Sequence, residues 1–303
     1  MTGWVTLAND WLRLELAPDH GASVVNLAAR LGEAWTPILR PTPPAEAAAG
    51  NVSRMASFTL APFSNRLPNG RFHFQGRPYQ LRPNTPEGHA QHGDVRRRPW
   101  QTQHVASESA VFVLDTRTCP DFNYPFPFTA EILYRLEGPA CETRLSLTNA
   151  GADPMPAGFG FHPYFPRSLG AAAEAVELEA GTSGVYADLI PTTPAGPVPP
   201  ELDFARRRPL ADTALNHCYA GWDGRASLQW PRAGVTLTLT AEAPLRHLVL
   251  FAPVGEPYFA VEPVTNATNA FNLHAAGVAG SGTLVLAPGA TVAAGFRLAL
   301  SAA

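Results

Sequence analysis

The stretch Leu12-Arg13-Leu14-Glu15-Leu16 alternates apolar and polar side chains with a period of two. Such alternation is typical of a β-strand that buries one face and exposes the other. Asn9-Asp10 stands just before it and predicts a turn that leads back to a preceding strand over Trp4–Leu7. The start of the chain therefore predicts an antiparallel pair of strands.

The same alternation recurs to the end of the 303-residue chain. Phe72–Phe74 and Arg77–Leu81 flank Gln75-Gly76, which predicts a hairpin. Eight further strands are predicted at Ala110–Thr116, Thr129–Leu136, Thr143–Asn149, Val176–Glu179, Val235–Ala241, His247–Phe251, Thr283–Leu286 and Thr291–Leu300. The last two flank Ala287-Pro288-Gly289, which predicts a turn.

Helical patterns are short by comparison. Ala45–Ala49 and Leu169–Ala175 are rich in alanine but have glycines beside them, and 31 prolines disfavour long helices. The Pro-rich segment Pro191–Pro200 predicts a long loop within a domain, because similar strands continue on both sides of it. We therefore expect a single all-β domain over residues 1–303, a large antiparallel β-sandwich of two packed sheets.

Composition narrows the possible functions. The chain has no lysine, and all 22 basic residues are arginine, which excludes a lysine Schiff base and the lysine of a P-loop. A net charge of -3 predicts no strong attraction to nucleic acid or to an anionic membrane. Three scattered cysteines, with no C-x-x-C pair, fit a reducing, cytoplasmic compartment. We expect neither a signal peptide nor a membrane span.

Four segments concentrate polar groups suited to binding a polyol. In the first, Ala61–Gly70, two asparagines, a serine and an arginine precede a hairpin; these residues are equally typical of turns. The second, His89–Asp94, carries two histidines three residues apart. Such a pair is compatible with metal ligation, but no third ligand follows at a familiar spacing, and a solvated loop is the alternative.

The third segment, Gly158–Phe165, places His162 among four aromatic residues. Burial would lower the pKa of that histidine, a nearby carboxylate would raise it, and a hydrogen-bonded core histidine is the alternative. In the fourth segment, Tyr258–Asn266, Glu262 ends an apolar strand. A carboxylate there must be paired, solvated or retained for a function.

Taken in order, these motifs resemble the aldose 1-epimerase (galactose mutarotase) family. The resemblance spans about residues 10 to 300 and is carried by Pro62–Arg66, Asn69–Phe72, His92-Gly93, Trp100, Phe161–Phe165, Leu215–Gly224, Glu262-Pro263 and Ala270–Asn272. It implies a β-sandwich of the galactose mutarotase-like supersandwich type, with the sugar in an open cleft. It also implies an isomerase that interconverts the α and β anomers of a free hexose or related monosaccharide.

The resemblance implies roles for three proton-carrying side chains. Glu262 matches the catalytic base, His162 the catalytic acid, and His92 a second histidine at the ring oxygen. The hydroxyl on C1 must lose a proton while the ring oxygen gains one, so an acid and a base suffice. We expect no metal and no other cofactor.

Three further residues are expected to bind the sugar. Arg66 matches a sugar-binding arginine, and Asn65 adjoins it in the same motif. Asn216 stands where the family commonly has an aspartate; the amide keeps an acceptor oxygen but loses the charge. Sugar preference is therefore left open, and the sequence predicts no particular oligomeric state.

Two other functions remain open. The first is a non-catalytic carbohydrate-binding or sensing protein, because a fold does not determine its function. The second is a hexose-6-phosphate 1-epimerase in which the arginines at 96–98 and 206–208 bind the phosphate. The wording of Pro62–Arg66 resembles the free-sugar branch of the family instead.

Overall fold

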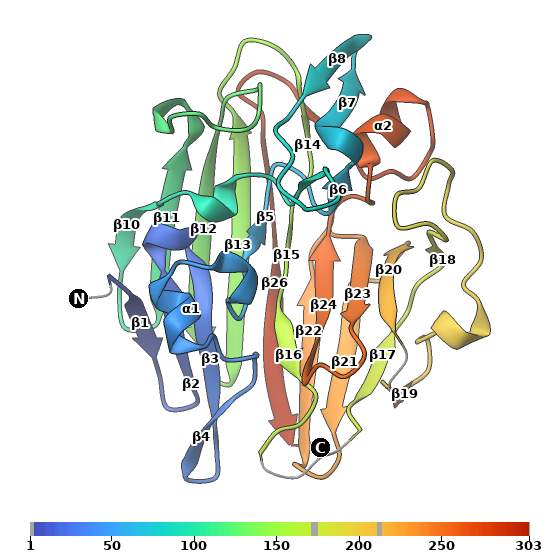
Figure 1. The fold of residues 1–303 in the computed structure, drawn as a ribbon. Coiled ribbons are helices and arrows are strands. Elements are labelled where there is room, and N and C mark those ends of the chain that lie inside the picture. Colours follow the sequence, from blue (N-terminus) through green and yellow to red (C-terminus); the bar gives the residue numbers. More distant parts are fainter. Residues whose placement is uncertain (1–2, 171–174, 211–213, 303) are drawn as a thin grey trace.

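The computed structural model describes residues 3–170, 175–210 and 214–302 of the chain. Its regular structure is dominated by antiparallel strands, as the alternation predicts (Figure 1). Within those ranges the helices are short, and none is long and apolar enough to cross a membrane. They are α1 (Pro44–Ala48), α2 (Ala270–Ala275), and the 3-10 turns η1 (Pro18–His20), η2 (Val52–Arg54), η3 (Pro68–Gly70), η4 (Val95–Arg97), η5 (Thr116–Thr118) and η6 (Pro200–Leu202).

One of the two alanine-rich segments forms a short helix. The segment Ala45–Ala49 contributes to the short helix α1, which begins at a proline that tolerates the first helical turn. The segment Leu169–Ala175 lies largely outside the described residues. The segment Pro191–Pro200 is a loop, as predicted, up to the start of η6 at Pro200, and only Gly196 within it forms a bridge, to Val185.

The largest sheet in the described part of the chain has nine strands. In spatial order they are β10 (Gln101–Val105), β11 (Ser109–Asp115), β12 (Phe128–Glu137), β13 (Ala140–Asn149), β26 (Thr291–Ala302), β22 (Val235–Ala241), β21 (Arg225–Trp230), β17 (Glu177–Ala180) and β19 (Arg208–Pro209). Every second residue of β12 is buried, and Ile132 lies opposite Leu145 of β13 in the core. Period-two burial thus follows the sequence pattern directly.

Two smaller sheets pack against the large one. One contains β1 (Val5–Ala8), β2 (Leu12–Ala17), β3 (Ser23–Leu31) and β4 (Ala34–Pro37). The other follows the order β18 (Gly184–Val185), β20 (Leu215–Ala220), β23 (His247–Ala252), β24 (Tyr258–Val264), β15 (Gly160–Phe161) and β5 (Thr59–Leu60), and β16 (Tyr164–Pro166) also pairs with β24. In Figure 1 the first of these sheets lies beside β10–β13, and β23 and β24 lie beside β21 and β22.

Hydrogen bonds and one continuous apolar core join the layers. The Tyr134 hydroxyl on β12 donates to the Ala22 carbonyl at 2.7 Å, and the Trp230 indole on β21 donates to the Pro166 carbonyl at 3.2 Å. The core contains buried side chains from all three sheets, including Leu14, Leu145 and Val261. These contacts make the fold a sandwich of antiparallel sheets.

Three two-stranded ladders complete the described strands: β6 (Arg66–Leu67) with β9 (Ala90–Gln91), β7 (Arg71–Phe74) with β8 (Arg77–Gln80), and β14 (Met155–Ala157) with β25 (Leu284–Leu286). Gln75 and Gly76 both have positive φ, 49° and 75°, as a two-residue hairpin turn requires. The predicted turn after Leu286 is present, but β25 pairs with β14, and β26 joins the large sheet instead.

The strand that carries Glu262 is β24. Its residues Phe259 and Val261 belong to the core between the sheets, whereas Ala260 and Val264 belong to a second apolar cluster on the other face. Because successive side chains alternate, Glu262 points to this second face. The expectation that Glu262 ends its strand is wrong: the ladder continues through Val264. Because both faces of β24 carry apolar residues, the sequence shows no alternation from which the end of the strand could be predicted.

Candidate active site

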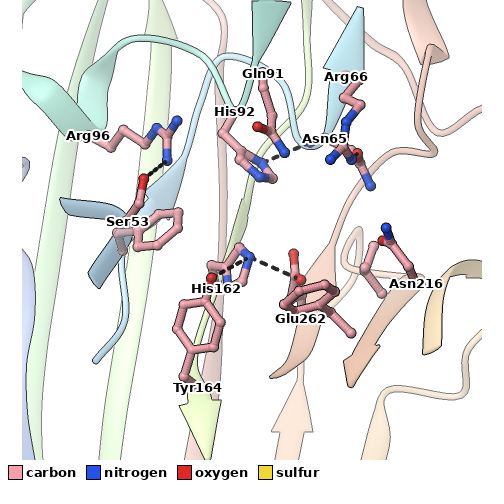
Figure 2. Close-up of a pocket in the computed structure, with 13 residues that line it drawn as sticks. Ser53, Asn65, Arg66, Gln91, His92, Arg96, His162, Tyr164, Asn216 and Glu262 are labelled. Atoms are coloured by element: carbon pink, nitrogen blue, oxygen red, sulfur yellow. Dashed lines mark hydrogen bonds and ion pairs between the residues drawn. The ribbon is translucent and has the colours of Figure 1, made fainter. Parts of the chain in front are cut away.

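The six site residues expected from the sequence line one pocket of about 200 Å³ (Figure 2). They are Asn65, Arg66, His92, His162, Asn216 and Glu262. The pocket is also lined by Arg96, which the sequence linked only to the hexose-6-phosphate alternative. The remaining lining residues, to which the sequence assigned no individual role, are Ser53, Phe58, Gln91, Tyr164, Val249 and Phe251. Segments separated by up to about two hundred residues of chain thus meet at one site.

Strand register brings His162 and Glu262 together. Gly160 pairs with Val264, and Tyr164 pairs with Ala260. His162 is midway between Gly160 and Tyr164, and Glu262 is midway between Ala260 and Val264, so the two residues lie opposite each other. His162 Nε2 lies 3.2 Å from Glu262 Oε1, and both side chains are almost fully buried. The contact is therefore a consequence of two neighbouring strands in a sheet.

The ring of His162 is fixed by aromatic neighbours. It lies 4.7 Å from the ring of Phe58 and 4.4 Å from that of Tyr164, whose hydroxyl is 3.5 Å from Nε2. Nδ1 is buried and has no hydrogen-bond partner in the described part of the chain. The phenylalanines around His162 in the sequence, such as Phe161, point into the core between the sheets, so they do not enclose it.

Burial controls the protonation of the pair. It raises the pKa of the Glu262 carboxyl well above its ordinary value, against the opposing effect of the Arg66 cation. It also lowers the pKa of His162 well below 6.5, and the cations Arg96 and Arg40 add to this effect. Both directions place the proton that the pair shares on Glu262. Of the two directions that the sequence left open for the pKa of His162, the lowering by burial prevails.

His92 is held by the backbone of Asn65. The two residues exchange hydrogen bonds: the His92 N–H donates to the Asn65 carbonyl at 2.8 Å, and the Asn65 N–H donates to His92 Nδ1 at 3.1 Å. Because Nδ1 accepts, the neutral ring carries its proton on Nε2. Burial, followed by the Arg96 cation, lowers the pKa of His92 well below 6.5. The ring is therefore a neutral hydrogen-bond donor.

Left-handed backbone makes this arrangement possible. Asn65 and His92 have φ of 57° and 62°, a region that asparagine tolerates better than most residues. Gly93 follows with φ of 64°, and a Cβ there would lie only 1.8 Å from the Ala61 carbonyl oxygen. The chain can therefore fold closely at this point only with glycine.

Arg66 and Asn216 lie toward the Glu262 side of the pocket (Figure 2). The Arg66 guanidinium donates to Asn65 Oδ1 at 2.9 Å, and its pKa is lowered mainly by burial. Asn216 is an exposed residue of β20, opposite Phe251 of β23. Two polar side chains thus flank the buried Glu262 carboxyl.

Several motif residues support the site without lining it. The Ser64 hydroxyl donates to the Asn266 carbonyl at 3.0 Å, which ties the loop before Arg66 to the end of β24. Asn272 joins α2 to β7 through hydrogen bonds with Arg71 and His73. Ser64 and Asn272, both in motifs that carry the family resemblance, therefore have structural roles that account for them.

The other histidine of the predicted pair, His89, stands at a turn. Its Nδ1 accepts from the Asn69 N–H at 3.2 Å. Among residues 3–170, 175–210 and 214–302, no group of three or more His, Cys, Asp or Glu is arranged to hold a metal ion.

The arginines of the two runs at 96–98 and 206–208 differ in position and in contacts. Arg96 alone among them lines the pocket, whereas Arg97 is exposed and Arg98 pairs with Asp94. In the second run, Arg207 pairs with Glu179 and Arg208 donates to backbone carbonyls, both away from the pocket.

Comparisons with known proteins show the family and the fold of the chain. A family model described as aldose 1-epimerase matches residues 5–299. The uncharacterized Escherichia coli K12 protein YphB is 29% identical over 279 residues, with 86% of this chain and 88% of YphB covered. A crystal structure of a provisionally assigned aldose 1-epimerase from the same organism is 27% identical, with a TM-score of 0.83 and 99% of each chain covered.

A further crystal structure supports the fold alone. It is that of a galactose mutarotase-like protein from Clostridium acetobutylicum, 17% identical to this chain. The TM-score is 0.86, and the match covers 99% of this chain and 95% of the other. The sandwich is thus shared at low sequence identity, so the site residues must be judged from this chain's own geometry.

Proposed function

The chain belongs to the aldose 1-epimerase family, and from that premise we propose that it interconverts the α and β anomers of a monosaccharide. Glu262 acts as the base at O1, and His162 acts as the acid at the ring oxygen O5. The observation that carries this proposal is the 3.2 Å contact between His162 Nε2 and Glu262 Oε1 in a pocket that also holds His92 and Arg66.

The contact suits the reaction because O1 and O5 are both bonded to C1. An acid and a base that serve these two oxygens must therefore be neighbours. Ring opening moves the O1 proton to Glu262 and a proton from His162 to O5, and the C1–O5 bond breaks. Rotation about C1–C2 exposes the other face of the aldehyde, and the reverse transfers close the ring. Both side chains regain their starting states, with no net loss of protons.

Catalysis requires the proton of the pair to lie on His162 and the charge on Glu262. Burial favours the opposite arrangement, whereas the Arg66 cation favours the carboxylate. A sugar hydroxyl that donates to Glu262 adds to the effect of Arg66 and stabilises the charged form. Substrate binding thereby prepares the acid and the base together.

The remaining polar groups bind and orient the sugar. His92 donates from Nε2 to the ring oxygen and does not itself transfer a proton, because its Nδ1 is already an acceptor. Arg66, held by Asn65, and the amide of Asn216 bind hydroxyls on the Glu262 side. Fixed donors of this kind align the hemiacetal for proton transfer.

Polarimetry tests the proposal. Freshly dissolved α-D-glucose, α-D-galactose and a panel of other neutral and charged aldoses are followed with the wild type, Glu262→Gln and Glu256→Gln. We expect the Glu262 variant to lose about 10²–10⁴-fold in kcat. The Glu256 variant is the matched control, because that carboxylate is exposed and outside the pocket, and it should equal the wild type.

Two outcomes contradict the proposal. One is a panel in which no aldose equilibrates faster than in buffer, and the other is full activity in Glu262→Gln. Calorimetric sugar binding without any rate acceleration would instead select the non-catalytic carbohydrate-binding alternative.

A further inference from the structure

Arg96 is a buried cation in the pocket that lacks a carboxylate partner. Its residue is 4% exposed, and its guanidinium makes one long contact, 3.4 Å from Nη1 to the Ser53 hydroxyl. Nε is buried with no hydrogen-bond partner, and no ion pair within 4.0 Å involves Arg96 among the described residues. An unpaired buried charge is unfavourable, so its presence in a pocket indicates a ligand with the opposite charge.

The position of Arg96 is set by its surroundings. It lies in η4, where the Trp100 indole donates to the Val95 carbonyl at 3.1 Å. The Gly21 N–H donates to the Arg98 carbonyl at 2.9 Å and fixes the end of the same turn. The guanidinium carbon stands 5.2 Å from the ring centre of Phe58. These contacts orient the cation before any ligand binds.

The site geometry shows which part of a sugar would reach this cation. Figure 2 places Arg96 at one end of the pocket and Asn216 with Arg66 at the other, with His162 and Glu262 between them. If O1 lies at Glu262 and O5 at His162, the next ring atom beyond O5 is C5. The substituent on C5 then extends toward Arg96 and away from Asn216.

We propose that the substrate is an acidic monosaccharide, with an anionic group on the carbon attached to C5, and that Arg96 binds this group. This inference rests on the proposed mutarotase function. A carboxylate, as in a hexuronate, or a phosphate ester on C6 supplies the required charge. A guanidinium can bind either group through two parallel hydrogen bonds.

An anion bound at Arg96 would also affect the catalytic acid, His162. The Arg96 cation is, after burial, the next cause that lowers the pKa of His162. Pairing that cation with the substrate removes much of its effect on the imidazole, which favours protonated His162. Binding of the acidic group is therefore coupled to preparation of the proton donor, and a neutral sugar lacks this coupling.

The test compares sugars that differ only at C6. Glucose, glucuronate and glucose 6-phosphate are assayed as α anomers, together with the galactose series, using the wild type, Arg96→Gln and Arg97→Gln. We expect the wild type to prefer an acidic member in kcat/KM, and Arg96→Gln to lose about 10–100-fold of that preference over the matched neutral sugar, whereas Arg97→Gln keeps it. Which acidic member is preferred distinguishes carboxylate from phosphate. Arg97, exposed and in the same turn, is the matched control.

Calorimetry with Glu262→Gln supplies a second readout that does not depend on turnover. Tighter binding of glucuronate or glucose 6-phosphate than of glucose supports the inference even if no sugar is epimerised. The inference is overturned if protein with intact Arg96 binds and turns over the acidic sugars no better than the neutral ones. If neutral sugars are still epimerised faster than in buffer, the proposed mutarotase function is retained. If Arg96→Gln does not fold, the comparison of acidic with neutral sugars, by turnover with the wild type and by binding to Glu262→Gln, decides the matter alone.

Discussion

The two walls of the pocket are built differently. Glu262 stands on β24, and His162 lies between β15 and β16, both of which pair with β24, so the register of these strands sets their contact. Asn65 and His92 stand where short loops meet, held by left-handed backbone and two reciprocal hydrogen bonds. The strand wall thus fixes the proton carriers relative to each other, and the loop wall fixes the groups that bind and orient the sugar.

This difference predicts distinct kinetic effects for the two walls. Changes on the strand wall should lower kcat, because they remove proton transfer in the transition state. Changes on the loop wall should act mainly on KM or on stability, because they disturb binding and local backbone conformation.

The largest effect is expected on the strand wall. His162→Asn should lower kcat by about 10²–10⁴-fold, since the amide cannot protonate O5. The double variant with Glu262→Gln should be little worse than either single variant, because the two groups act as one unit. Steady-state polarimetry measures both effects.

His104→Asn, on the exposed edge strand β10, is the control and should equal the wild type. Additive losses in the double variant would show that His162 and Glu262 act independently. That result would contradict the view that the strand wall holds them as one proton-transfer unit.

The next effect is expected at the base of the loop wall. Gly93→Ala places a Cβ against the Ala61 carbonyl and should cost about 1–3 kcal/mol of unfolding free energy from overcrowding. A further cost of about 1–2 kcal/mol comes from the left-handed backbone. Denaturant unfolding measures the loss, and displacement of His92 should also lower kcat/KM.

Gly88→Ala is the matched control, because Gly88 has φ of 81° but no atom within 4 Å of an added Cβ. It should show only the smaller backbone cost. Equal stability losses in the two variants would mean that close packing at Gly93 does not hold the loop wall.

The sequence predicted the strand framework well where one face is buried. Val235–Ala241 coincides with β22, and the strand beginning at Leu12 pairs as expected. It failed where both faces are apolar, as in β24, because alternation then disappears and the strand end is hidden. The local pattern predicted the turn after Leu286 but not the partner of either strand: β25 pairs with β14, and β26 joins the large sheet.

The site was predicted from the sequence only as a set of residues. Nothing local indicates that His162 and Glu262 pair, because one hundred residues of chain separate them. Nor could the pattern say which of three adjacent arginines is buried. That depends on the path of η4 under Trp100, which turns Arg96 inward and leaves Arg97 exposed.

A smaller effect should follow from removing the support for Arg66. Asn65→Gly keeps the left-handed backbone and the N–H that bonds to His92, but it deletes the acceptor of the Arg66 guanidinium. We expect KM to rise about 10-fold with little change in kcat, the usual scale for one hydrogen bond. Asn69→Gly, also left-handed at φ 54°, is the control. A selective fall in kcat would place Asn65 with the proton carriers.

The last effect concerns the pH dependence of stability. Burial raises the pKa of Glu262 in the folded protein, so its contribution to stability is fully present below about pH 4.5 and is lost as pH rises through the raised pKa. Glu262→Gln cannot ionise. We therefore expect its Tm to exceed that of the wild type by a margin that is absent at low pH and grows as pH rises. Thermal unfolding across the pH range measures this margin.

The opposite sign applies to the histidine of the pair. Burial lowers the pKa of His162, so its contribution is present above pH 6.5 and is lost as pH falls through the lowered value. His162→Asn should therefore gain on the wild type as pH falls. Asn65→Gly removes no titrating group, and its difference from the wild type should stay constant with pH. If the loop variant shows the same pH dependence as the strand variants, then the cost of burying ionisable groups is spread over the pocket and is not concentrated in the strand-borne pair.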